Sequence, residues 1–406
     1  MHFLCVTNSS WEFLHLFAVF KYRAPLEKGE MPEATGSRMP GRPHNVPTFL
    51  VSHDGTYFRV ESQMSAIRAS NRESWPSLQN GNSVICQKNE SGQMYKERFE
   101  IFKKINNRSY TRSHDEMRSY EAYEENQKIV NEHNSYYETG KSSFRLATNT
   151  LADMNTDSYL KGYLRLLRSP AISDSDNIAD IVGSPLMNNV PESFDWRKKG
   201  FITPSYNQQS CGSCYAFSIA QSIEGQVFKR TGKILALSEQ QIVDCSISHG
   251  NQGCIGGSLR NTLRYLQATG GLMRSLDYKY ASKKGECQFV SELAVVNVTS
   301  WAILPTKDEN AIQAAVAHIG PVAVSINASP KTFQLYSEGI YDDVSCSSTS
   351  VNHAMLLIGF DKDFWILKNW WGELWGEAGF MRMRKEIALN GIPRVNSKIY
   401  SAFNST

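Results

Sequence analysis

Apolar residues recur every three or four positions along the stretch that follows Cys214, from Ala216 to Val227. This period of 3.6 residues predicts an amphipathic helix that begins at Cys214. Basic residues in the expected last turn, followed by Gly232, predict where the helix ends. Because a polar turn leads into the helix, we expect Cys214 at its positive end, where free N–H groups favour the thiolate.

The pattern changes from helical to alternating within the second half of the chain. Helices are predicted after a capping box at Ser238, over residues 259–268, and after a second capping box at 306–309. Beyond Gly320 the signals are those of strands, at Val322–Ile326, His353–Phe360, 364–367 and 380–383. Helices followed by antiparallel strands predict an α+β domain in two lobes, with a substrate cleft between them.

The first half of the chain contains one strongly helical region. Over residues 94–138 charged residues are dense and aromatic residues recur at helical spacing, which predicts two amphipathic helices broken near 106–109. From spacing alone, a plain helical hairpin is the simplest interpretation. Residues 21 to 90 are rich in Pro, Gly, Ser and Asn, so we expect mostly loop or disorder there, with a short strand pair over 48–60.

Composition argues against several classes of function. With 43 basic and 40 acidic residues the net charge is +3, which is too small to indicate a nucleic acid or a membrane surface as partner. No stretch approaches 18 uninterrupted apolar residues, so we expect no membrane span. Residues 1–20 make a poor signal peptide, because polar residues interrupt the apolar stretch.

The chain has eight cysteines, five of them between positions 211 and 287. Such clustering suits disulfides in an oxidising compartment, although the sequence alone does not fix their pairing. Sequons at Asn297 and Asn327 give weak support for a glycoprotein. The Cys211–Cys214 spacing also occurs in redox and zinc sites, but the chain has no second such pair, so we expect neither metal nor cofactor.

A thiolate nucleophile needs a base, and the base needs an orienting group. His353 follows Cys214 by 139 residues, and Asn369 follows His353 by 16. Taken singly, His353 would be an ordinary core histidine and Asn369 a turn residue. Together with Cys214 at this spacing, they indicate a cysteine peptidase site.

These residues and the stretch 208–218 resemble the catalytic motifs of papain-family, cathepsin L-like cysteine proteases. Two further motifs resemble those of the family's inhibitory propeptide: Tyr123, Asn126, Val130 and Asn134, then Ala147, Asn149, Leu151 and Asp153. The resemblance implies a two-lobed papain-like fold, with a helical left lobe and an antiparallel β-barrel-like right lobe, preceded by a helical prodomain. The expected parts are an N-terminal extension (1–90), the prodomain (91–168), an activation linker (169–189) and the peptidase domain (190–406).

The resemblance also implies roles for single residues. Cys214 would be the nucleophile, His353 the base, Asn369 its orienting group and Gln208 a donor to the oxyanion. The expected substrate-binding residues are Gly256, Gly257, Ser258, Leu259, Val351, Asn352, Ala354, Val395 and Trp371, of which Trp371 would also shield the His353–Asn369 bond. The implied disulfides are Cys211–Cys254 and Cys245–Cys287. Cys346 is expected to be unpaired or unconventionally paired, because its usual partner position is Asn390.

The function implied is that of a thiol endopeptidase made as a zymogen, with an apolar side chain preferred at the second position before the cleaved bond. We expect acid to release the prodomain, because its ion-paired carboxylates lose charge. Expected partners are protein substrates, the chain's own propeptide and cystatin-like inhibitors. A monomer in the lysosome or outside the cell is expected.

Three departures from the family pattern lie close to the site. Gln209 stands where Gly is usual, Tyr215 where Trp is usual and Trp370 where Ser is usual. Because of these departures, a second interpretation is that the chain is a catalytically impaired homologue. A third alternative is an interaction protein whose prodomain inhibits other peptidases.

Overall fold

The computed structural model describes residues 16–22, 49–51, 57–59, 86–169, 184–304, 308–346 and 350–385. The chain forms two compact units, Leu26–Met94 and the remainder. In the smaller unit β2 (Phe49–Val51) pairs antiparallel with β3 (Tyr57–Arg59), which confirms the strand pair expected there. The candidate site residues that the structure describes all lie in the larger unit.

One long sheet organises the larger unit, in the order β4-β9-β12-β11-β10-β8-β1-β7-β6, with β5 paired to β10. Its strands are β1 (Leu16–Tyr22), β4 (Phe144–Leu146), β5 (Phe194–Asp195), β6 (Leu272–Met273), β7 (Ala294–Ile303), β8 (Val322–Ile326), β9 (Tyr336–Tyr341), β10 (His353–Phe360), β11 (Phe364–Lys368) and β12 (Phe380–Arg384). All neighbours are antiparallel except β12 and β9. Every residue of β10 is buried, so this strand lies at the centre of the core.

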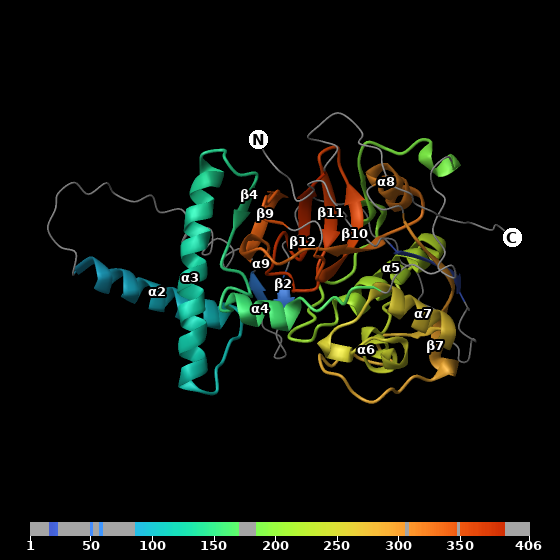
Figure 1. The fold of residues 1–406 in the computed structure, drawn as a ribbon, viewed down its shortest axis with the longest axis horizontal. Coiled ribbons are helices and arrows are strands. Elements are labelled where there is room, and N and C mark those ends of the chain that lie inside the picture. Colours follow the sequence, from blue (N-terminus) through green and yellow to red (C-terminus); the bar gives the residue numbers. More distant parts are fainter. Residues whose placement is uncertain are drawn as a thin grey trace. The chain divides into compact units, whose positions relative to one another are not determined.

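In the described residues from 184 onward, helices and short 3-10 turns accompany the sheet. The helices are α5 (Cys214–Thr231), α6 (Glu239–Cys245), α7 (Leu259–Thr269) and α8 (Glu309–His318), with the single turn α9 (Lys331–Gln334). The 3-10 turns of the larger unit are η1 (Pro185–Met187), η2 (Trp196–Lys199), η3 (Ile247–His249), η4 (Gly253–Ile255) and η5 (Ser291–Leu293). Figure 1 shows α5, α6 and α7 grouped on one side and strands β9 to β12 on the other, which gives the two lobes.

Helix α5 joins the two lobes, because polar side chains on its buried face bond to strands and turns of the sheet. Ser218 Oγ donates to the Met355 carbonyl of β10 at 2.6 Å, and Ser222 Oγ donates to the Pro321 carbonyl at 3.0 Å. Gly225 permits the same close approach, since a Cβ there would lie 2.6 Å from the Pro321 ring. These contacts fix the start of α5 relative to β10.

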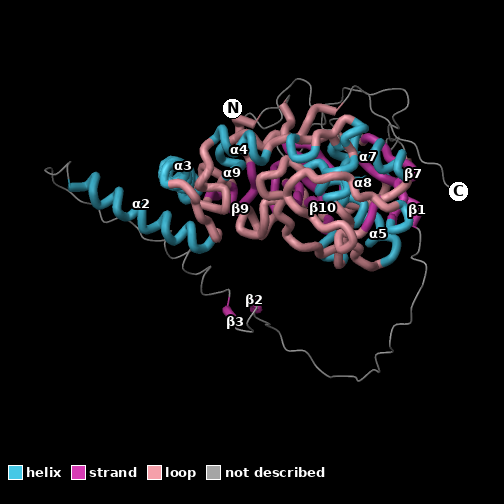
Figure 2. Tube along the Cα trace, turned by 90° about the horizontal axis from the view of Figure 1, so that it is seen from below, coloured by secondary structure: helices cyan, strands magenta, loops and turns pink. Residues whose placement is uncertain are grey.

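Among the described residues before position 170 the helices are α2 (Cys86–Ile105), α3 (Ser113–Glu138) and α4 (Thr156–Tyr163). Tyr123, Asn126, Val130 and Asn134 share the buried face of α3, as their helical spacing requires. Strand β4 adds to the edge of β9, with Phe144 opposite Gly339. Figure 2 shows α3 and α4 near β9, at the end of the larger unit opposite α5 and α7.

Most elements of the peptidase part were predicted correctly. Helix α5 begins at Cys214 and ends at Gly232, which has the left-handed φ of 70°. Strands β8 and β10 have the predicted bounds, and β11 and β12 are one residue longer than predicted. The break between the two prodomain helices falls where it was expected.

Two expectations about helix caps were wrong, and several elements were not predicted. Helix α8 begins at Glu309 and is capped by Asp308, whose side chain accepts from Ala311 N–H, rather than by residue 306, which lies outside the described residues. Ser238 caps α6 as predicted, but the Gln241 side chain bonds to Met273 N–H instead of closing the box. Regular structure at β1 and at residues 86–93 occupies positions that showed no helical or strand pattern. Strands β4, β6, β7 and β9 had no clear signal in the sequence.

Among the described residues, no helix has both the length and the apolarity to cross a membrane.

Candidate active site

Cys214 is the first residue of α5, and the turn before it is held rigidly. Cys211 is bonded to Cys254 with an S–S distance of 2.05 Å, and Gly212 N–H donates to the Cys254 carbonyl at 2.9 Å. The N-cap residue Ser213 makes no side-chain cap, so the N–H groups of the first turn remain directed at the helix start. The Cys214 side chain is fully buried in this form of the chain.

The structure contains both disulfides that the resemblance implies, Cys211–Cys254 and Cys245–Cys287. Cys346 is also disulfide-bonded, in agreement with the second of the two states expected for it. Cys214 is the free cysteine of the described part. Of the two sequons, Asn327 is buried and its amide donates to the Ser350 carbonyl, whereas Asn297 is only partly buried on β7.

His353 begins β10, and Asn369 follows the end of β11. The distance between His353 Nε2 and Asn369 Oδ1 is 2.8 Å. The backbone N–H of Trp370 donates to the same Asn369 oxygen, also at 2.8 Å. Since a backbone N–H can only donate, the shared atom is an oxygen and His353 Nε2 must carry the proton. The other ring nitrogen, Nδ1, has no hydrogen-bond partner among the described residues and keeps its lone pair.

The thiol and the imidazole lie on facing elements that meet. The backbone N–H of Ala354, the residue after His353, points at the Cys214 sulfur. Trp371 packs over the imidazole with ring centroids 4.8 Å apart, so it shields the His353–Asn369 bond from water. Burial raises the pKa of the Cys214 thiol to about 12 and lowers the pKa of His353 to about 4. In this form of the chain both groups are therefore neutral.

Gln208 lies beside the helix start, fully buried. Its Nε2 donates to the Cys211 carbonyl at 2.9 Å and lies 3.5 Å from the Tyr163 carbonyl of the prodomain. The Gln208 carbonyl accepts from the Tyr280 hydroxyl at 2.8 Å, and the same hydroxyl lies 2.7 Å from Ser213 Oγ. Tyr280 was missed from the sequence, because it lies in an irregular loop with no periodic or motif signal.

The end of the prodomain runs between the two walls of the cleft. Leu166 N–H donates to the Asn352 carbonyl at 3.0 Å, and Leu167 N–H donates to the Gly257 carbonyl at 2.9 Å. Gly256 allows this approach: its φ is +137°, and a Cβ there would lie 2.1 Å from the Arg165 carbonyl oxygen. The segment thus occupies the backbone groups that an extended peptide would use.

The remaining expected substrate-binding residues lie around this crossing. Ser258 caps α7 and its Oγ lies 2.9 Å from Ser169 Oγ. Leu259 and Ala354 are fully buried, and Val351 is partly buried. Asn352 also fixes the neighbouring turn, because its side chain accepts from Ala328 N–H and donates to Ser329. Val395 lies outside the described residues.

Two of the three departures from the family pattern are accommodated locally. Gln209 adopts the left-handed φ of 54°, with its side chain exposed and its N–H donated to Asn207 Oδ1 at 2.8 Å. Tyr215 is fully buried and donates to the Gly253 carbonyl at 3.0 Å. The loop that carries Gln208 therefore keeps its place.

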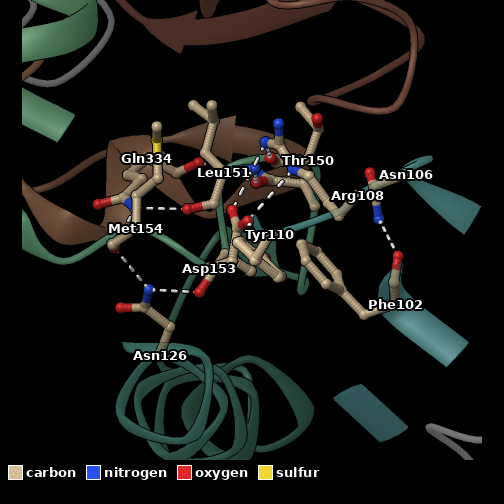
Figure 3. A network of polar contacts seen from close by, with 12 residues as sticks. Phe102, Asn106, Arg108, Tyr110, Asn126, Thr150, Leu151, Asp153, Met154 and Gln334 are labelled. Atoms are coloured by element: carbon tan, nitrogen blue, oxygen red, sulfur yellow. Dashed lines mark hydrogen bonds and ion pairs between the residues drawn. The ribbon is translucent and has the colours of Figure 1, made fainter. Parts of the chain in front are cut away.

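The prodomain is attached at a second place, formed by α9 and β9 of the peptidase part (Figure 3). Gln334 Nε2 donates to the carbonyls of Leu151, at 2.7 Å, and Met154, at 2.9 Å. Asn126 of α3 donates to the Met154 carbonyl and accepts from Lys331 Nζ at 3.0 Å. We call this set of contacts, together with the β4–β9 pairing, the dock.

An ionic contact stiffens the prodomain side of the dock. Asp153 lies 3.2 Å from Arg108 and accepts from the Tyr110 hydroxyl at 2.7 Å, as Figure 3 shows. Burial raises the pKa of the Asp153 carboxyl above its usual value, which outweighs the opposing effects of Arg108 and Tyr110. No group of His, Cys, Asp and Glu side chains in the described ranges could hold a metal ion.

A thiol at the start of α5, a histidine at the start of the adjoining strand β10 and a preceding segment bonded to residues beside both are the features of a thiol-dependent enzyme in precursor form. The family model "Papain family cysteine protease" matches residues 190–401, and the model "Cathepsin propeptide inhibitor domain (I29)" matches residues 94–159. The chain belongs to the papain family and is a cathepsin L-like cysteine protease zymogen with its propeptide, in a papain-like fold.

Similar proteins span the zymogen rather than the peptidase domain alone. Procathepsin L of Mus musculus is 36% identical over 296 residues, which cover 70% of this chain and 86% of the relative. Cathepsin K of Mus musculus is 37% identical over 293 residues, covering 71% and 88%. The solved structure of digestive procathepsin L 3 of the Tenebrio molitor larval midgut is 32% identical with a TM-score of 0.63, and covers 72% of this chain and 94% of that one.

Proposed function

We propose that residues 190–406 form an endopeptidase in which Cys214 is the nucleophile, His353 the general base and Asn369 its orienting group. One observation carries this proposal: the Asn369 oxygen accepts from both Trp370 N–H and His353 Nε2. This leaves Nδ1 as the basic nitrogen of the ring, and the backbone N–H of the next residue, Ala354, points at the Cys214 sulfur. The geometry supports proton transfer from the thiol to the imidazole.

The reaction follows from these positions. Nδ1 takes the proton of Cys214, and the thiolate attacks the carbonyl carbon of the peptide bond. The Cys214 backbone N–H and the Gln208 side chain stabilise the negative oxygen of the tetrahedral intermediate. The imidazolium then gives its proton to the leaving amine, and a thioester remains. Water, deprotonated by the same nitrogen, hydrolyses the thioester and restores the thiol.

The prodomain, residues 91–168, prevents this reaction in two ways. Its backbone occupies both walls of the cleft, and its presence keeps thiol and imidazole dry and therefore neutral. When it leaves, water returns and the two groups can form the reactive ion pair. We propose that cleavage within the linker 169–189, close to Asn189, makes this change permanent.

The pocket for the second residue before the cleaved bond is proposed to be apolar. Leu259, Val351 and Ala354 carry no charge, and Ser258 is engaged as the cap of α7. Peptides with Leu or Phe at that position should have kcat/KM values at least about tenfold above those with Glu or Lys, because a buried charge would lack a partner. Equal rates for both sets would refute the assignment of the pocket.

The decisive test is acid processing of the full chain. Incubation at mildly acidic pH should shorten the chain to a product beginning near Val190, with peptide cleavage that a thiol alkylating agent abolishes. Cys214→Ala should show neither, and activity in that variant would refute the proposal. Titration of active thiol also distinguishes an impaired homologue, which would react slowly with the alkylating agent and would show little self-processing or peptide cleavage. An inhibitory role of the prodomain towards other peptidases would appear as tight inhibition of those peptidases by residues 91–189 in isolation, with no thiol-dependent turnover by residues 190–406.

The proposed setting is the lysosome or the exterior of the cell. The disulfides Cys211–Cys254 and Cys245–Cys287 support an oxidising compartment, where such bonds persist. Fractionation of cells that express the chain would test this, with a cytosolic product as the contrary result.

A further inference from the structure

We propose that Trp370 is a positioning residue that fixes the facing geometry of Cys214 and His353. This inference rests on the proposed function, and concerns a residue that stands where the family usually has Ser. Trp370 is fully buried, directly after Asn369 and before Trp371. Its ring reaches an element from each lobe.

The first contact is with the helix that carries the thiol. The Trp370 ring stacks on Phe217 of α5 at a centroid distance of 5.6 Å and an interplanar angle of 24°. Phe217 in turn meets Tyr280 edge to face at 4.8 Å. Tyr280 holds the Gln208 carbonyl, so one aromatic stack supports both the start of α5 and the Gln208 loop.

The second contact is with the strand that carries the imidazole. The indole N–H of Trp370 donates to the Ala354 carbonyl of β10 at 2.9 Å. Ala354 follows His353, and its own N–H points at the Cys214 sulfur. The indole of Trp370 therefore fixes Ala354, the residue that follows His353 and contacts the Cys214 sulfur through its N–H.

A serine side chain cannot make both contacts, because it has no ring to stack on Phe217 and too short a reach to span from the loop to β10. The backbone of Trp370 makes two hydrogen bonds: its N–H donates to Asn369 Oδ1, and its carbonyl accepts from Gln208 N–H. Both bonds can persist when the side chain is replaced. Replacing the side chain therefore leaves the Asn369–His353 bond intact and alters the separation of the two lobes.

The test uses the full chain, processed by acid, with Trp370→Phe and Trp370→Ser. The rate of Cys214 alkylation by iodoacetamide is measured against pH, together with kcat and KM for a peptide. Trp370→Phe keeps a ring and loses the N–H, so we expect kcat to fall about tenfold with KM nearly unchanged. The acid limb of the alkylation profile should move upward by about one pH unit, since a looser pair holds the thiolate less well. Trp370→Ser should show larger changes in both.

Trp196→Phe is the matched control. Whereas Trp370 contacts Phe217 and Ala354, Trp196 is buried, donates its indole N–H to the Val316 carbonyl at 2.8 Å and packs its ring edge to face against Phe194. It should lower the melting temperature without moving the alkylation profile. A Trp370→Phe enzyme with the wild-type profile and kcat would overturn the proposal.

Two provisions keep the outcome decisive. If the Trp370 variants do not fold, Phe217→Leu removes the stacking partner while the indole remains, and should move the profile in the same direction; an unmoved profile would refute the proposal. Alkylation requires no peptide turnover. A wild-type enzyme that alkylates normally but cleaves nothing would therefore contradict the proposed function, while the variant profiles would still decide the role of Trp370.

Discussion

The prodomain meets the peptidase domain in two places that differ in chemistry. Across the cleft, backbone N–H groups of Leu166 and Leu167 donate to the carbonyls of Asn352 and Gly257. At the dock, side chains such as Gln334 and Lys331 add further contacts to the main-chain pairing of β4 with β9. Main-chain bonds do not change with pH, whereas side-chain groups can. We therefore propose that an acid response, unlike the blocking of the site, would depend on the dock.

One histidine beside the dock, His133, would weaken the attachment of the prodomain when it gains a proton. His133 of α3 lies 3.0 Å from the Phe144 carbonyl, and its ring packs against the Phe144 ring at 4.4 Å. Burial lowers the pKa of His133, against weaker opposing effects of the Phe144 carbonyl and the Asp343 charge. Neutral His133 therefore stabilises the folded prodomain at pH values above the unfolded pKa of about 6.5. This stabilisation is lost as the pH falls from that value through the lower folded pKa.

The carboxylates do not support the expectation that acid acts through them. The pKa of Asp153 is raised by burial, so the docked state binds this proton more tightly and acid stabilises it. The pKa of Asp115 is lowered by Arg112, which has the expected sign, but that pair is exposed on the surface and contributes little. We therefore propose His133, rather than a carboxylate, as the group through which acid would weaken the attachment of the prodomain.

The largest expected effect concerns the cleft. The rate of Cys214 alkylation at neutral pH should rise at least about a hundredfold when the prodomain is removed, because the thiol is then both accessible and able to ionise. Labelling of the zymogen and of the processed enzyme, with mass spectrometry of the Cys214 peptide, measures this. Similar rates in the two forms would mean that the prodomain does not suppress the thiol.

The next effect concerns the dock. Gln334→Ala removes two hydrogen bonds and leaves the Leu151 carbonyl without this donor, at a cost of about 1–3 kcal/mol. Processing at a fixed, mildly acidic pH should become about tenfold faster, as seen by gel electrophoresis over time. Gln267→Ala, which removes a glutamine of α7 bonded to Trp301, should leave the rate unchanged. An unchanged rate in Gln334→Ala would show that the cleft contacts alone hold the prodomain.

The same two regions differ in how far the sequence predicts them. The cleft residues follow from motifs and from long periodic elements, since α5 and β10 bury whole faces and leave a clear pattern. The dock depends on β4 and β9, which are short and alternate poorly in polarity, so pairing between distant segments decides them. Tyr280 and the Trp370 stack were missed for the same reason: their partners are remote in sequence.

A smaller effect should follow from the dock histidine. His133→Gln retains a donor for the Phe144 carbonyl but cannot acquire charge, so the pH midpoint of processing should fall by about 0.5 unit. His114→Gln changes an exposed histidine of the same helix and should leave the midpoint where it is. Midpoints measured by gel over a pH series decide between them. A midpoint that stays fixed in His133→Gln would assign the acid response to another group.

The smallest effect is expected at the cleft, in Gln209→Gly. The left-handed φ of 54° costs a residue with a side chain about 1 kcal/mol, which glycine avoids. Glycine also gives the unfolded chain more freedom, which costs about 0.4–1 kcal/mol. The two terms nearly cancel, so the free energy of unfolding should change by less than about 0.5 kcal/mol, and kcat/KM should not change. A marked rise in kcat/KM would show instead that Gln209 displaces Gln208, and that this departure from the family pattern impairs the oxyanion site.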